Sequence, residues 1–168
     1  MSAYFEAAFP ANGPHGWSLA GWLNSKHRDY LVFCGFSRFE RICMVKRGLP
    51  ATMLVKIASD MRIPSAELLR WLGIPKAIGD RKVRERVALS IGEGERVVGI
   101  ARLIGKVARV VHESGDLEGF DPARWTAAWL GRPSQLLGGR RPADYMDTAD
   151  GRALVASLVA QMQSGAYA

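Results

Sequence analysis

The sequence predicts an all-α fold. Apolar residues recur at helical spacing through most of the chain after residue 50, and the strict alternation typical of a half-buried strand is scarce. Proline, glycine and capping residues fall where such helices would begin and end. The chain has 168 residues, of which 48% are hydrophobic. This length allows one domain or two small packed units, and this hydrophobicity excludes bulk disorder.

We predict three segments, namely residues 1–45, 46–115 and 116–168. The first segment begins with glycine, proline, histidine and aromatic residues that show no sustained periodicity, which predicts a partly ordered arm or variable subdomain. A helix is predicted after Pro50, because the following apolar residues share one helical face. That face contains Met53, Leu54, Ile57, Ala58 and Met61.

Two short helices joined by a tight turn are predicted between residues 63 and 86. Pro64 and Pro75 each suit the first turn of a helix, and Gly73 between them suits a left-handed C-terminal cap. This is the shape of a helix-turn-helix unit. The shared core of the two helices is expected to contain Leu68, Leu69, Leu72, Ile74 and Ile78.

Most of the excess positive charge lies around this unit. Residues 1–61, 62–112 and 113–168 carry net charges of +3, +6 and −2, which make up the total of +7. The second helix of a helix-turn-helix unit enters the DNA major groove, and flanking cations neutralise phosphates. The alternative is a basic helix face that is merely solvated. The expected DNA-binding residues are Lys76, Arg81, Lys82, Arg84 and Arg86.

Gly79 and Asp80 are expected to interrupt this basic helix. Glycine lowers helix stability by about 1 kcal/mol relative to alanine. Aspartate repels phosphate. A further hypothesis is therefore a purely protein-binding module that has lost its contact with DNA.

The longest predicted helix spans residues 97–111. Its polar side carries Arg102, Lys106, Arg109 and Glu113. The apolar stripe has no aromatic residue to anchor it at a membrane surface, which favours a core or subunit-interface helix. The stripe contains Val97, Ile100, Ala101, Ile104, Val107, Ala108 and Val111.

Two further helices are predicted in the last segment. The first starts at Asp121 and Pro122, buries Trp125 and Trp129, and stops at Gly131. The second is capped by Thr148 and ends at Gly165. Its inner face is expected to contain Leu154, Val155, Leu158, Val159 and Met162.

No catalytic, cofactor or metal site is expected. The histidines His15, His27 and His112 have no acidic residue or cysteine at metal-ligand spacing. No serine, cysteine or paired carboxylate has a plausible base and orienting partner, so the protein is not expected to be an enzyme. Cys34 and Cys43 fit a reduced compartment. Without a signal-like or membrane-spanning stretch, we expect a cytoplasmic protein and no membrane partner.

A glycine pair near residue 140 has two interpretations. Gly138 and Gly139 precede Arg140 and Arg141, and such a loop can hold a phosphate through backbone N–H groups. The alternative is a sharp turn between helices. The alternative function is a free-standing helix-turn-helix regulator. Its C-terminal domain would sense either a small anionic ligand at this glycine pair or a protein.

The C-terminal residues contain an ordered series that runs from Trp129 and Leu130 through the Leu-Gly-Gly turn at residues 137–139 to Gly165 and Tyr167. This series resembles the toxin-binding domain of the Xre/MbcA/ParS antitoxin family. The resemblance extends to a lead-in at Arg47, Gly48, Leu49 and Pro50, and it covers roughly residues 45–168. Where the family usually has Pro-Asn-Pro, this chain has proline, serine and glutamine at residues 133–135. The matching series consists of Trp129, Leu130, Pro133, Leu137, Gly138, Gly139, Pro142, Asp144, Gly151, Val155, Leu158, Gly165 and Tyr167.

The resemblance implies an antitoxin whose partner is a RES-domain toxin that acts on NAD. In this family the C-terminal end of the antitoxin enters the NAD-binding cleft of the toxin. A homodimer that binds operator DNA and represses its own operon is also implied. A tail with an aromatic ring, a hydroxyl and a carboxylate suits such a cleft through stacking and charge-assisted hydrogen bonds. The residues expected to bind toxin are Gly138, Gly139, Arg140, Arg141, Gly165, Ala166, Tyr167 and Ala168.

Overall fold

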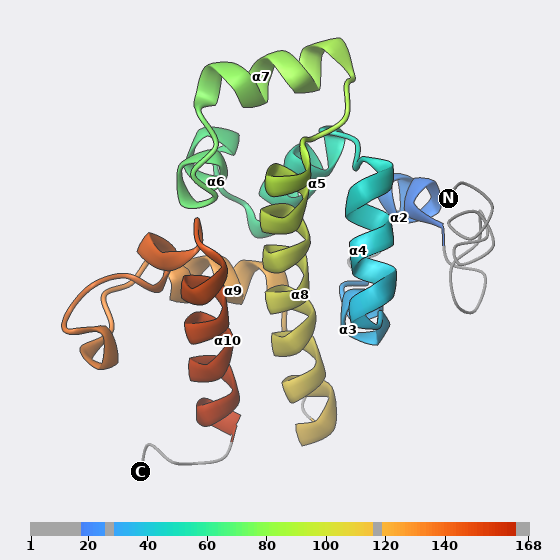
Figure 1. Cartoon of the computed structure of the whole chain (residues 1–168). Helices are drawn as coiled ribbons and strands as arrows, with labels where there is room; N and C mark the ends of the chain where they lie inside the picture. Colours follow the sequence, from blue (N-terminus) through green and yellow to red (C-terminus); the bar gives the residue numbers. More distant parts are fainter. Residues whose placement is uncertain (1–17, 26–28, 116–118, 164–168) are drawn as a thin grey trace.

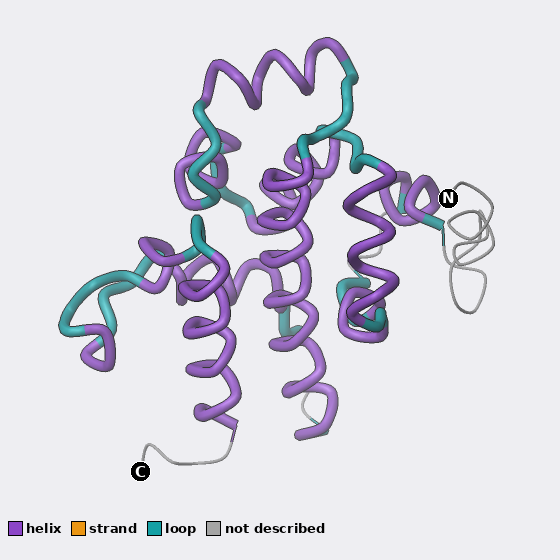
Figure 2. Tube along the Cα trace, in the orientation of Figure 1, coloured by secondary structure: helices purple, strands orange, loops and turns teal. Residues whose placement is uncertain are grey.

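The computed structural model describes residues 18–25, 29–115 and 119–163, and these residues form an all-α structure. Figure 2 shows helices joined by short loops, and no strand occurs in the described part of the chain. The all-α prediction is therefore confirmed. The helices are α2 (Leu19–Asn24), α3 (Val32–Gly35), α4 (Arg38–Arg47), α5 (Thr52–Met61), α6 (Ser65–Trp71), α7 (Lys76–Glu85), α8 (Ile91–Ser114), α9 (Pro122–Leu130), η2 (Gln135–Leu137), η3 (Pro142–Tyr145) and α10 (Ala149–Gln163).

Helix α8 is the centre of the fold. It begins earlier than the predicted residue 97, because Ser90 and Glu93 form a capping box that satisfies two backbone N–H groups. Helices α3, α4, α9 and α10 all pack against it (Figure 1). Although α8 has 24 residues, none of the described helices combines the length and the apolar character that a membrane span needs.

The N-terminal residues that the structure describes contribute to the hydrophobic core. Trp22, Tyr30 and Phe33 are buried, and the Trp22 ring meets the other two rings edge to face at centroid distances of 5.4 and 5.0 Å. The Tyr30 hydroxyl donates a hydrogen bond of 2.8 Å to the buried carboxylate of Asp60 on α5. These contacts between distant residues supply the order that local periodicity does not indicate.

The segment between α4 and α5 gives a physical reason for the Arg-Gly-Leu-Pro lead-in. Gly48 has a φ of 90° and ends α4. Leu49 is buried, and its carbonyl accepts a 2.7 Å hydrogen bond from the N–H of Leu89. The chain before α5 is thereby joined to the chain before α8.

The last two long helices differ in part from their prediction. Asp121 caps α9 and Gly131 ends it as predicted, but the fully buried positions are Ala123, Thr126, Ala127 and Leu130. Trp125 and Trp129 are only partly buried, and their rings stack with centroids 5.9 Å apart.

On α10, the residues buried as predicted are Val155, Leu158 and Val159. Leu154 and Met162 were expected on the same face but are exposed. Leu154 lies about 100° around the helix from Val155, and Met162 lies in the last turn. The face of α10 that is buried in the core is therefore narrower than the apolar residues of this helix predict.

Candidate functional site

The helix pair α6–α7 has the predicted tight turn. Gly73 adopts a left-handed φ of 59°, and the N–H of Ile74 donates a 2.9 Å hydrogen bond to the carbonyl of Leu69. The guanidinium of Arg96 on α8 donates hydrogen bonds of 3.0 Å to the carbonyls of Leu72 and Gly73. The turn is therefore held against the central helix, which fixes the direction of α7.

Gly79 does not interrupt α7, in contrast to the prediction. The helix is continuous from Lys76 to Glu85, and Gly79 is buried against α6. A Cβ atom at this position would lie 2.5 Å from a methyl carbon of Leu69. Asp80 forms an ion pair with Lys76 one turn before it. Glycine is thus required here for the close packing of two helices, and the carboxylate is neutralised within the helix.

The five cations predicted to bind DNA fall into two groups. Lys76 is paired with Asp80, and Lys82 donates a 2.6 Å hydrogen bond to the carboxylate of Glu93 in the α8 cap. Burial opposes the charge of Glu93, but hydrogen bonds from Lys82 and Ser90 outweigh it and hold the pKa of this carboxyl below its ordinary value. Lys82 therefore joins α7 to α8.

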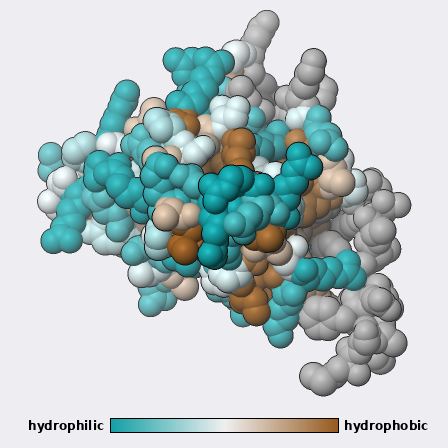
Figure 3. All heavy atoms as spheres, turned by 90° about the horizontal axis from the view of Figure 1, so that it is seen from above, coloured by the Kyte–Doolittle hydropathy of each residue, from teal (hydrophilic) through white to brown (hydrophobic). Residues whose placement is uncertain are grey.

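The other three predicted cations, Arg81, Arg84 and Arg86, are exposed. Arg81 and Arg84 lie on the side of α7 opposite to Gly79, which faces α6. Figure 1 places α7 at one end of the molecule, and Figure 3 views this end, where hydrophilic residues gather across the middle of the face. These arginines form an exposed cationic surface, which we call the α7 surface.

The second predicted surface contains a small closed loop. Residues Ser134 and Arg140 form an isolated bridge with a 2.9 Å hydrogen bond from the serine N–H to the arginine carbonyl. Gly138 and Gly139 have φ values of 60° and 81°, which let the chain reverse between the bridging residues. Leu136 in this loop is 49% exposed. The loop projects from the helices in Figure 1.

The backbone of this loop does not offer a phosphate cradle. The N–H groups of Gly138, Gly139 and Arg140 donate to carbonyls of the loop itself. The N–H of Arg141 donates to the carboxylate of Asp144, and the guanidinium of Arg141 pairs with the same carboxylate at 2.9 Å. All four N–H groups of residues 138–141 are therefore already used. This geometry favours the interpretation as a sharp turn, because no N–H group of residues 138–141 is left to bind an anion.

The start of α10 is built around a glycine. Thr148 accepts a 3.0 Å hydrogen bond from the N–H of Gly151, as predicted for an N-cap. A Cβ atom on Gly151 would lie 2.0 Å from the carbonyl oxygen of Tyr145. The close approach of η3 and α10 therefore needs glycine at this position. This contact fixes the direction of α10.

Residues 116–168 also present exposed apolar side chains. Leu136, Leu154 and Met162 are 49%, 41% and 40% exposed. None of the three was predicted as a binding residue. Leu154 and Met162 were expected on the inner face of their helix, so the sequence contains no signal for their exposure. These side chains are available for contact with a partner. The predicted tail residues Gly165, Ala166, Tyr167 and Ala168 lie outside the described residues.

Comparison with known proteins agrees with this arrangement. Residues 117–165 match the family described as the antitoxin Xre/MbcA/ParS C-terminal toxin-binding domain. The chain is 36% identical over 132 residues to a Prs ADP-ribosylating antitoxin of a Sphingobium species, covering 79% of this chain and 83% of that protein. It is also 29% identical over 123 residues to an antitoxin Xre of Yersinia enterocolitica, covering 73% of this chain and 78% of that protein.

Proposed function

Because the chain belongs to the Xre/MbcA/ParS antitoxin family, we propose that it neutralises a RES-domain toxin by placing its tail in the NAD site of that toxin. The observation that carries this proposal is the match of residues 117–165 to a toxin-binding domain. The name of the Sphingobium relative, which couples an antitoxin with ADP-ribosylation, supports a toxin with NAD chemistry. The protein is then a regulator and not an enzyme.

The exposed apolar residues support a toxin interface that is wider than the tail. Leu136 lies in the projecting loop, and Leu154 lies on the outer side of α10. Both belong to the matched domain, and neither contributes to the core. We infer that the loop residues Gly138, Gly139 and Arg140 shape this contact, and that Arg141 positions the loop through Asp144.

We expect Leu136→Asp to weaken toxin binding by roughly 30-fold, because a central apolar contact contributes about 2 kcal/mol. Val55→Asp is the matched control, since Val55 is 44% exposed on α5, outside the toxin-binding domain. The measurement is the affinity of each purified variant for the purified toxin by calorimetry. Equal losses in the two variants would argue against an interface at the loop.

We also propose that the α7 surface binds operator DNA and that the chain thereby represses its own operon as a homodimer. The support comes from geometry, because Arg81, Arg84 and Arg86 are exposed on a helix that follows a tight turn. The continuous α7 favours this proposal over a protein-binding module that has lost its contact with DNA, because neither Gly79 nor Asp80 breaks the helix. A cytoplasmic location fits a protein that binds both DNA and a toxin.

We expect the double variant Arg81→Ala/Arg84→Ala to bind every DNA tested, including the upstream DNA, less tightly than the unaltered chain does. Its slope of log affinity against log salt should be smaller by about 2, since each phosphate contact contributes about 0.9. Gel shifts over a range of salt concentrations measure this slope. Arg124→Ala on α9 is the control, because Arg124 is exposed at another part of the molecule. Absence of salt-dependent binding by the unaltered chain would exclude autorepression.

A further inference from the structure

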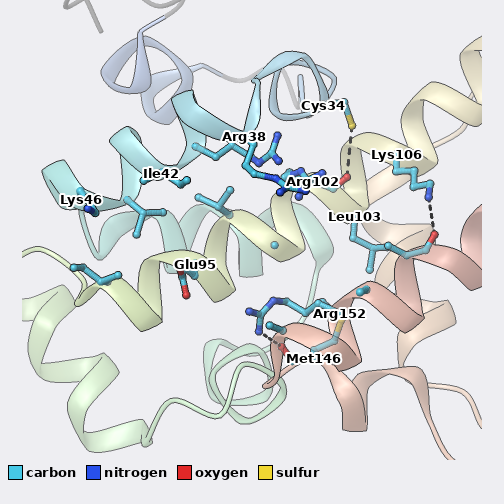
Figure 4. Close-up of a pocket in the computed structure, with 18 of the residues that line it drawn as sticks. Cys34, Arg38, Ile42, Lys46, Glu95, Arg102, Leu103, Lys106, Met146 and Arg152 are labelled. Atoms are coloured by element: carbon cyan, nitrogen blue, oxygen red, sulfur yellow. Dashed lines mark hydrogen bonds between the residues drawn. The ribbon is translucent and has the colours of Figure 1, made fainter. Parts of the chain in front are cut away.

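A groove with a volume of about 620 Å³ lies over α8 between α4 and α10. Both flanking helices pack against α8, which forms the floor (Figure 4). The groove is separate from the α7 surface and from the loop at residues 134–140, because none of those residues lines it. The proposed DNA contact therefore does not use this groove.

The groove is strongly cationic. Among the described residues that line it, Glu95 is the only acidic one. The positive side chains come from three helices far apart in the sequence, and Figure 4 shows Arg38 of α4 close to Arg102 of α8. The lining cations of α4 are Arg38, Arg41 and Lys46. The lining cations of α8 and α10 are Arg102, Lys106, Arg109 and Arg152.

Two of these cations are held in place by backbone carbonyls. Lys106 donates a 2.7 Å hydrogen bond to the carbonyl of Ala156, and Arg152 donates one of 3.1 Å to the carbonyl of Met146. Carbonyls fix a cation but carry no net charge. Burial lowers the pKa of Arg41, and repulsion from Arg102 lowers it further. The like charges therefore act on one another, and an anionic partner would relieve this repulsion.

The surface between the cations is apolar. Val98 and Leu103 of α8 form buried parts of the floor. Ile42 and Ile91 line the groove as well, and they are 45% and 54% exposed. Large apolar side chains that remain exposed beside a charged groove are typical of a surface that a partner covers. The occupant must therefore present apolar and negative groups together.

The length of the groove indicates an elongated occupant. Its lining residues on α8 run from Ile91 to Arg109, which corresponds to about 27 Å of helix. A helix of about 18 residues has this length and packs naturally between two others. A single nucleic-acid strand would stack its bases on aromatic rings, and no aromatic residue is among the described residues that line the groove.

We propose that this groove binds an acidic amphipathic helix of a partner protein, with the apolar face of that helix on α8 and its carboxylates against the flanking cations. This groove is a further attachment point, in addition to the tail, the loop at residues 134–140 and the α7 surface.

The probe for this proposal is a synthetic helical peptide of about 18 residues, with leucine on one face and glutamate on the other. A scrambled peptide of the same composition is its control. Cys34 lines the groove and is partly exposed, whereas Cys43 is fully buried. The rate of alkylation of Cys34 therefore reports where the peptide binds. We expect the amphipathic peptide to slow this rate in a concentration-dependent manner, and the scrambled peptide to leave it unchanged.

Charge-reversal variants test the electrostatic part. Arg38→Glu/Arg102→Glu alters two exposed side chains of the groove and should weaken peptide binding by about 30-fold, because two attractions become repulsions. The control Arg124→Glu/Arg132→Glu makes the same charge change at two exposed residues outside the groove and should weaken binding far less. Fluorescence anisotropy measures both affinities.

Three results would overturn the proposal. The first is equal binding of the amphipathic and scrambled peptides, which would show that charge alone is recognised. The second is equal weakening by the two double variants. The third is a single-stranded oligonucleotide that slows the alkylation of Cys34 as strongly as the peptide does. That result would make the groove a nucleic-acid site.

Discussion

A chain that lacks Ala166, Tyr167 and Ala168 is expected to lose toxin neutralisation while it keeps its fold. These residues come after α10 in the sequence, since α10 ends at Gln163. If the tail occupies the NAD site, its removal leaves that site open. Cells that co-express the toxin with the truncated chain should then grow no better than cells that express the toxin alone.

Substitutions at Tyr167 separate the contributions of the tail. Tyr167→Ala removes the ring and should lose most of the protection, whereas Tyr167→Phe keeps the ring available for stacking and should retain most of it. Both variants and the truncated chain should melt at the temperature of the unaltered protein, because the last few residues of a domain usually contribute little to stability. Full protection by the truncated chain, at equal protein levels, would reject insertion of the tail.

The substitution Gly151→Ala is expected to have the largest effect on stability. Its Cβ atom would lie 2.0 Å from the carbonyl oxygen of Tyr145 and 2.7 Å from the hydroxyl of Thr148, which caps the helix. Backbone cannot move aside as a flexible side chain can. We expect a loss of about 3 kcal/mol or more in the free energy of unfolding, and a melting temperature lower by roughly 10 °C.

Gly35→Ala is the matched control for this substitution. Gly35 lies in α3 with no left-handed φ, and a Cβ atom there would meet no described atom within 4 Å. Its melting temperature should stay within about 2 °C of that of the unaltered protein. Chemical denaturation gives the two free energies. A Gly151→Ala chain that is as stable as the Gly35→Ala chain would mean that η3 and α10 do not approach as closely as described.

The elements that local chemistry determines were predictable from the sequence. Gly73 marks a turn that only its left-handed backbone allows, and Asp121 and Thr148 cap helices at the expected positions. The capping box of Ser37 and Glu40 is an equally local signal, but no helix was predicted at the position of α4. Each of these features depends on residues within one or two turns of each other.

The rest depends on contacts between distant residues. Gly79 is a helix breaker by local propensity, but its neighbour Leu69 on α6 makes glycine the residue that fits. Lys82 is one cation among several in the sequence, and only the fold brings Glu93 to it. The groove is the strongest case, because Arg38 and Arg102 approach one another only when α4 packs against α8. Helical periodicity alone predicts that these cations lie on solvated helix faces.

The most direct measurement is a titration of the purified toxin with the purified chain while NAD consumption is followed. We predict that the full chain stops NAD consumption at stoichiometric amounts. The chain without residues 166–168 should still bind the toxin through its C-terminal domain but leave NAD consumption unchanged. A tight complex with the full chain, in which the toxin consumes NAD at the rate of the free toxin, would contradict neutralisation by occupation of the NAD site.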